Sequence, residues 1–197
     1  MRPRSRKAHN KVLDAAIELF AVRGIDGTSM DAIAEASGVS KATIYKHWAD
    51  KDALCLEVMI RVHGLDIERP AFRTSDLRRD MCDRFKYEAP EHPSMLRDRL
   101  MPHLMAHAAR NQNFGQVWRM RVMEPLRVSV VEFLERGMEE KIFPEDLNIP
   151  MAMALLIGPL VYGKMLATGD LSREAIAEGV VDAFWRAFAT RSSKATG

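Results

Sequence analysis

The chain has 197 residues, a length that suits one domain or two small ones. Hydrophobic residues make up 47% of it and charged residues 28%, which fits a globular protein with a sizeable core and disfavours a disordered, collagen-like or disulfide-stapled chain. The formal net charge of +2 by itself indicates no partner. A run of basic residues precedes any acidic one: Arg2, Arg4, Arg6, Lys7 and Lys11. Such a segment either follows a polyanion or is a solvated terminus.

Cysteine usage and hydropathy bear on the compartment. Cys55 and Cys82 are the only cysteines, and they lie far apart without metal-ligand spacing, so a reducing cytoplasm is the simplest interpretation. No secretory signal is expected, because Asp14 and Glu18 interrupt the apolar segment that follows the basic one. The longest mostly apolar run, at 149–163, is too short to span a bilayer, so no membrane partner is expected.

Apolar residues recur with helical spacing almost throughout, and no stretch alternates as a strand does, which predicts an all-α fold. A first helix is expected at about 10–23 and ends at Gly24, which can adopt a left-handed conformation. Thr28 and Asp31 have the spacing of a helix N-terminus, where a hydroxyl and a carboxylate bind free backbone amides. The further helices are expected at about 29–37, 40–48, 51–63, 74–88, 93–110, 114–139, 149–167 and 172–190.

The second and third expected helices, joined by a glycine turn, form a helix-turn-helix unit. Gly38 supplies the positive φ that the turn needs, and Ala34 is small where the next helix crosses close to it. Val39 fills the corner, while Ile44 and Trp48 attach the second helix of the unit to the core. The opposite side of that helix is polar enough to meet solvent or a groove.

An α-helix fits the major groove of DNA, and its N-terminal residues reach base edges. Lys41 is therefore the candidate for contacts with guanine acceptors, and Ala42 for a contact with a thymine methyl group. Lys51 adds charge in the first turn of the following helix, where backbone amides favour an anion. The candidate DNA-binding residues are Thr28, Ser29, Ser40, Lys41, Ala42, Thr43, Tyr45, Lys46, His47 and Lys51. The alternative is that the lysines are solvated and Tyr45 only packs.

This stretch resembles the TetR (tetracycline repressor-type) family of bacterial transcription regulators. The family pattern is roughly T-[ST]-x-x-x-I-A-x-x-[AL]-G-V-S-x-x-T-[IL]-Y-x-[HY]-F-x-x-K-[ED]-x-L, and the resemblance extends over about residues 8–60. The matching positions are Thr28, Ser29, Ile33, Ala34, Gly38, Val39, Ser40, Thr43, Ile44, Tyr45, His47, Lys51, Asp52 and Leu54. Two positions depart mildly from the pattern: Ser37 replaces Ala or Leu, and Trp48 replaces Phe.

The resemblance implies a division of roles. Residues 1–50 would form a helix-turn-helix DNA-binding domain with a basic N-terminal arm, and 51–197 a helical domain for effector binding and dimerisation. The helices within about 149–190 are the most apolar, so they are expected to form a homodimer interface, unless they only complete the monomer core. The expected function is repression from a palindromic double-stranded operator, released by a small-molecule effector. An activator would carry the same N-terminal unit.

Methionine and aromatic residues of the middle helices are candidates for an effector pocket, because methionine adapts to varied apolar ligands. The candidates are Phe85, Met101, Met105, Trp118, Met120, Met123 and Tyr162, although core packing explains each nearly as well. His103 and His107 share a helix face, but no carboxylate or thiol stands at a helpful spacing, so no metal site is expected.

Other classes of function find little support in the sequence. It contains no G-x-S-x-G elbow, phosphate-binding glycine loop, dinucleotide fingerprint or H-E-x-x-H motif, so neither an enzyme nor a cofactor is expected. A helical module that binds a protein or a membrane through the same unit is the other alternative. The basic residues on one side of the unit, Lys41, Lys46 and Lys51, favour DNA instead.

Overall fold

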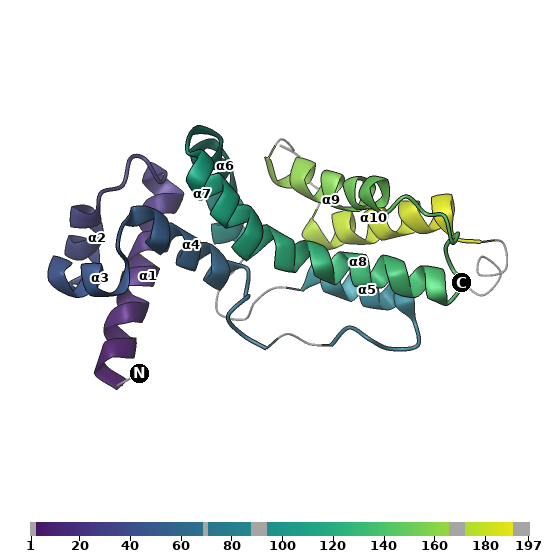
Figure 1. Ribbon diagram of the computed structural model, residues 1–197, viewed down its shortest axis with the longest axis horizontal. Helices are drawn as coiled ribbons and strands as arrows, with labels where there is room; N and C mark the ends of the chain where they lie inside the picture. Colours follow the sequence, from purple (N-terminus) through teal and green to yellow (C-terminus); the bar gives the residue numbers. More distant parts are fainter. Residues whose placement is uncertain (1–2, 69–70, 88–93, 166–171, 191–197) are drawn as a thin grey trace. The chain divides into compact units, whose positions relative to one another are not determined.

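The computed structural model describes residues 3–68, 71–87, 94–165 and 172–190 (Figure 1), and over these ranges the chain is helical without a strand, which confirms the all-α prediction. The helices are α1 (Pro3–Arg23), α2 (Met30–Ser37), α3 (Lys41–His47), α4 (Lys51–Val62), α5 (Leu77–Lys86), α6 (Ser94–Arg110), α7 (Gln112–Trp118), the π-helical turn η1 (Arg119–Met123), α8 (Glu124–Glu139), α9 (Ile149–Met165) and α10 (Arg173–Phe188). None of the helices in these ranges has the length and apolar character needed to cross a membrane.

Two helices differ from the sequence prediction. Helix α1 begins at Pro3 instead of near residue 10, so Arg6 and Lys7 belong to a helix and not to an extended arm. The physical reason is that Pro is well tolerated in the first helical turn and that the residues after it are mostly good helix formers. The segment expected as one helix over 114–139 contains η1, in which the Glu124 N–H donates to the carbonyl of Arg119, five residues earlier.

The chain divides into two compact units. The first consists of residues 1–68 and 88–124, and the second of residues 69–87 and 125–197. Packing thus groups α6, α7 and η1 with α1–α4, and α5 with α8–α10. The predicted boundary at residue 50 divides the chain by expected function, whereas these units are defined by packing. The functional boundary therefore stays a prediction.

In the first unit α1 lies against α2, α3, α4 and α6. Apolar residues at helical spacing give α1 a buried face, and α2, α3 and α4 each contribute residues that close over it. The buried residues of this core include Val12, Ala16, Phe20, Ile33, Ile44, Leu54, Val58 and Leu104. Because α2 and α3 both lie against α1, the helix-turn-helix unit has a defined orientation within the first unit.

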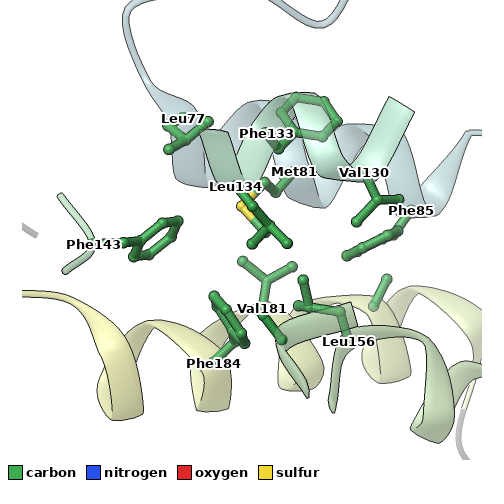
Figure 2. Close-up of a cluster of buried hydrophobic side chains, with 12 residues drawn as sticks. Leu77, Met81, Phe85, Val130, Phe133, Leu134, Phe143, Leu156, Val181 and Phe184 are labelled. Atoms are coloured by element: carbon green, nitrogen blue, oxygen red, sulfur yellow. The ribbon is translucent and has the colours of Figure 1, made fainter. Parts of the chain in front are cut away.

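In the second unit side chains of α5 and α8 meet those of α9 and α10 (Figure 2). The buried cluster includes Leu77, Met81, Phe85, Val130, Phe133, Leu134, Phe143, Leu156, Val181 and Phe184. Gly137 of α8 is packed so closely that a Cβ atom there would lie 2.2 Å from Cδ2 of Phe143. At the edge of this core Asp80, 1% exposed, accepts hydrogen bonds from Thr74 and from Arg136 of α8.

Candidate nucleic-acid interface

The turn between α2 and α3 requires its glycine for conformational reasons alone. Gly38 has φ 65° and ψ 22°, and its N–H donates to the Glu35 carbonyl at the end of α2. A Cβ atom at this position would meet nothing within 4 Å, so space is not the constraint. Glycine is needed because other residues rarely adopt a left-handed conformation.

Each helix of the unit has a polar N-cap. The cap of α2 is Ser29 and not Thr28, which the spacing with Asp31 predicts, because the Thr28 hydroxyl donates to the Gly24 carbonyl. Ser29 Oγ accepts from the Ala32 N–H at 3.1 Å, and Ser40 Oγ accepts from the Thr43 N–H at 3.4 Å. The Ser40 and Thr43 hydroxyls are also hydrogen bonded, with 2.9 Å between their oxygens. Ser29, Ser40 and Thr43 therefore have local structural roles that leave each hydroxyl at or near the surface.

The inner face of α3 is fixed and the outer face is exposed. Ile44 is 1% exposed and Trp48 is 2% exposed, so the helix is attached along one side. The predicted contact residues on the other side are exposed: Lys41, Ala42, Tyr45, Lys46 and His47. Lys41 forms an ion pair with Asp31, 2.5 Å between Nζ and Oδ1, with both side chains more than half exposed. An exposed pair of this kind is weak, so the Lys41 ammonium can exchange its partner for a nucleic acid at little cost.

Two predicted contact residues lie apart from this surface. Thr28 is 1% exposed, and its hydroxyl donates to the Gly24 carbonyl at 2.7 Å. The half-buried Lys51 donates from Nζ to the Thr28 carbonyl at 3.0 Å. The prediction that the Thr28 side chain contacts DNA is therefore corrected: its hydroxyl is used inside the fold, because it holds the turn that precedes α2.

Sequence reasoning missed His9 and Glu57, two residues that hold the end of α3 through Trp48. The indole N–H of Trp48 donates to Oε2 of Glu57 in α4 at 2.5 Å, and Nε2 of His9 in α1 lies 2.6 Å from the other carboxylate oxygen, Oε1. The His9 ring stacks on the indole, with 4.6 Å between ring centroids and 26° between planes. We call these three side chains, Trp48, Glu57 and His9, the Glu57 bridge. The only sequence signal for it is Trp48 itself, since a buried indole N–H requires an acceptor.

A second polar cluster joins α6 to the α1–α2 turn and to α4. His107, 8% exposed, lies between two carboxylates: Nδ1 is 2.7 Å from Oδ1 of Asp26, and Nε2 is 2.9 Å from Oδ1 of Asp52. Arg110 also donates to Asp26, and Asn111 donates to Asp52. Hydrogen bonds from Arg110 and His107 hold the pKa of Asp26 below its ordinary value, against the opposite effect of burial. Over the described ranges no three His, Cys, Asp or Glu side chains are placed to hold a metal ion.

The predicted effector residues are divided between the two units. Phe85 and Tyr162 belong to the second unit, where Phe85 is 6% exposed within the core and Tyr162 is 62% exposed on α9. Met101, Met105, Trp118, Met120 and Met123 belong to the first unit, with Met120 66% exposed. None of the seven lines the cleft of about 470 Å³ beside the Glu57 bridge, nor the second unit's grooves of about 400 and 630 Å³.

The chain matches two family models that together extend over most of its length. Residues 12–58 match a model described as bacterial regulatory proteins of the tetR family, and residues 73–184 match a tetracyclin repressor-like C-terminal domain. The uncharacterized HTH-type transcriptional regulator YdeS of Bacillus subtilis is 26% identical over 196 residues, which cover 98% of this chain and 96% of YdeS.

Two solved structures extend the comparison. A TetR transcriptional regulator from Agrobacterium tumefaciens, 18% identical, has a similar fold with a TM-score of 0.69, and the match covers 99% of each chain. The flavonoid-responsive regulator FrrA is 25% identical with a TM-score of 0.63, over 94% of this chain and 98% of FrrA.

Proposed function

The chain belongs to the tetR family of bacterial regulatory proteins and is a DNA-binding transcriptional regulator, and from this premise we propose that it is a homodimeric repressor of a palindromic operator, released by a small-molecule effector. Its family and relatives are regulators and not enzymes. The observation that carries the proposal is the outward face of α3, where Lys41, Tyr45 and Lys46 are exposed on a helix whose other face is fixed.

We assign the contacts with DNA to this face. Lys41, in the first turn of α3, reaches guanine acceptors in the major groove, and Ala42 contacts a thymine methyl. Tyr45, Lys46 and His47 donate to phosphate oxygens along the same groove. The proposed contact set is completed by Ser29, Ser40, Thr43 and Lys51. In a dimer the two α3 helices enter successive major grooves about 34–36 Å apart, which matches a palindromic operator.

The homodimer is proposed on the apolar surface of α9. Met151, Leu155 and Tyr162 are 57%, 46% and 62% exposed, and their spacing of i, i+4 and i+11 places them on one side of the helix. Small residues between them, Ala154 and Gly158, are exposed as well, so a second helix can approach closely. A contiguous exposed apolar surface marks an interaction site, and a two-fold axis brings two copies of it together. The interface would extend over about 149–190, as predicted.

A small-molecule effector is supported by the likeness to FrrA, a regulator named as flavonoid-responsive. For this chain we keep Met101, Met105, Trp118 and Met123 as the favoured pocket residues. Phe85 is used in the core of the second unit, and Met120 and Tyr162 are mostly exposed, so these three remain weaker candidates. The effector would bind one of two conformations more tightly and so reduce operator affinity. We place the protein in the cytoplasm, on the nucleoid when bound to its operator.

Selection of bound sequences from random duplex DNA by the purified full chain tests the proposal. A palindromic consensus with half-sites about one helical turn apart is expected, and its affinity should fall steeply with salt because several phosphates are neutralised. No enrichment by folded, dimeric protein would contradict it. A reporter promoter that carries the selected site then separates repression from activation, the alternative that the same DNA-binding unit allows.

A further inference from the structure

Trp48 ends α3 and brings a polar atom into a buried position. Its side chain is 2% exposed, and an indole N–H can only donate. The family pattern has phenylalanine at this position, which needs no acceptor. Here Glu57 of α4 provides one, with 2.5 Å between the indole Nε1 and Oε2. A buried donor without a partner costs free energy of folding. Glu57 removes this cost for the Trp48 indole, because its carboxylate accepts the hydrogen bond.

The same carboxylate is shared with α1. Oε1 of Glu57 lies 2.6 Å from Nε2 of His9, so each oxygen of the carboxylate accepts from a different helix. Nδ1 of His9 is buried without a hydrogen-bond partner among the residues that the structure describes, so the ring acts through Nε2. The ring also stacks on the indole of Trp48 and meets the edge of His47, with 5.5 Å between centroids and 79° between planes.

Helix α3 has little rigidity of its own. It spans Lys41–His47, seven residues, and a helix this short is not stable without tertiary support. Its first turn is held by Ser40, and its last turn is held by Ile44 and Trp48. The Glu57 bridge attaches this last turn to both α1 and α4. The same turn carries the exposed residues Tyr45, Lys46 and His47.

We propose that His9 is a positioning residue for operator recognition: through Glu57 it orients the Trp48 indole, and with it the end of α3 that carries the phosphate contacts. The inference rests on operator binding by α3 as proposed above, but it requires neither repression nor an effector. It concerns residues that the family resemblance does not select, because His9 precedes the matched pattern and Trp48 departs from it.

The test measures the affinity of full-length variants for one labelled probe, the palindromic duplex selected by the parent protein. His9→Ala and Glu57→Gln should each bind about tenfold more weakly, since each loses a charge-assisted hydrogen bond. His9→Gln should recover most of the affinity, because its amide N–H can donate to Glu57. Circular dichroism and sedimentation should show that all variants remain folded and associated as the parent is.

Asp14→Asn is the matched control. Asp14 lies on α1 and pairs with Arg61 of α4, 3.1 Å between Oδ1 and Nη2, so this pair also ties α1 to α4 and includes no residue of α3. We expect its affinity to stay within about twofold of the parent, because the Asp14 side chain is 60% exposed and water screens its contribution. An equal loss in Asp14→Asn and His9→Ala would overturn the proposal, because any tie between the two helices would then suffice.

A double-mutant cycle with Trp48→Phe isolates the coupling. Phenylalanine removes the indole N–H, so Glu57→Gln should cost little further affinity in the Trp48→Phe background. The indole N–H resonance of Trp48, identified by its loss in Trp48→Phe, should shift in both Glu57→Gln and His9→Ala.

Unchanged affinity in His9→Ala, or no recovery in His9→Gln, would overturn the inference while the parent still binds the probe. A parent that selects no DNA would instead remove the operator binding on which the inference rests.

Discussion

Nε2 of His107 lies 2.9 Å from Oδ1 of Asp52, so the end of α6 is joined to the first turn of α4 inside the first unit. The other ring nitrogen faces Asp26 in the turn before α2. The buried ring therefore lies between two carboxylates that come from different segments of the chain. One side chain of α6 thereby holds two segments that border the helix-turn-helix unit.

Replacement of His107 tests this contact. We expect His107→Ala to lower the free energy of unfolding by about 1–3 kcal/mol, since the contacts of the buried ring with Asp26 and Asp52 are lost, while Arg110 and Asn111 still donate to these carboxylates. Urea denaturation measures the change. His103→Ala is the control, because His103 lies one turn earlier on α6 and is half-buried. A comparable loss in both variants would show that only the volume of the side chain matters.

The buried pair of Asp80 and Arg136 makes stability sensitive to acid. Burial by itself raises the pKa of Asp80, but hydrogen bonds from Arg136 and Thr74 outweigh it and hold the pKa below its ordinary value of 3.8. A carboxyl group with a lowered folded pKa stabilises the fold fully above its unfolded pKa, and the contribution is lost as pH falls through the folded value. Unfolding free energy should therefore decrease below about pH 4, with Asp26 contributing in the same direction.

Asp80→Asn should flatten that acid dependence. The variant should also have a lower free energy of unfolding at neutral pH. Removal of one partner of a buried ion pair costs about 3–5 kcal/mol, and we expect a loss near the lower end because Arg136 still donates to Glu140. Unfolding curves from about pH 3 to pH 7 for parent and variant measure both effects. An equally steep acid dependence in the variant would place the responsible groups elsewhere.

Gly137 and Gly179 are two helical glycines with opposite expected outcomes. Gly137→Ala would drive a Cβ atom against the ring of Phe143, at 2.2 Å, and should destabilise the protein by about 1–3 kcal/mol. Gly179→Ala in α10 meets nothing within 4 Å and should stabilise by about 0.5–1 kcal/mol, because alanine favours a helix. Thermal unfolding of both variants measures the difference. Similar midpoints would contradict the close packing of α8 on Phe143.

Replacement of Lys41 and of Lys46 by alanine should change DNA binding in different ways. Lys41→Ala removes a base contact, so it should cost about 1–3 kcal/mol on the selected operator and relax the preference at one position of each half-site. Lys46→Ala removes a phosphate contact, so it should weaken binding to all duplexes alike and reduce the salt slope by about 0.9 per contact. Fluorescence anisotropy over a salt series checks both. Identical effects of the two variants would contradict the assigned roles.

The proposed dimer surface can be tested with a single charge. Leu155→Glu would bury a carboxylate in the interface and should shift the protein to monomer in sedimentation experiments, with operator affinity reduced in consequence. Val22→Glu is the control, since Val22 is 64% exposed on α1 in the other unit. A dimer that persists in Leu155→Glu would direct the search for the interface to another face.

Local patterns predicted the helices well because each depends on residues close in sequence. The apolar spacing indicated α2, α3 and α4 to within a residue or so of their bounds, and Ser40 and Asp50, which cap α3 and α4, are of the residue types that favour a helix N-terminus. The π-helical turn was missed because one widened turn hardly alters the apolar period. It precedes Pro125, which lacks the N–H that a regular helix would use there.

The candidate site was predictable only in part, for a related reason. The exposed face of α3 follows from helical spacing and from the residues that anchor it. His9 and Glu57 contribute through distant contacts with Trp48, which no local pattern specifies. The burial of Phe85 likewise depends on how α5 packs in the second unit, so its aromatic character alone did not separate a core residue from a pocket residue.

The interleaved make-up of the two units has a consequence for protein engineering. The chain contributes residues 1–68 to the first unit, leaves it, and contributes 88–124 later, and α6 from this later segment packs against α1. A chimaera can take its DNA-binding helices from one regulator by a single crossover near residue 50 or 68. Its α1 then packs against an α6 that comes from the other regulator. Exchange of specificity between relatives should succeed more often with three crossovers, which transplant both segments of the unit together.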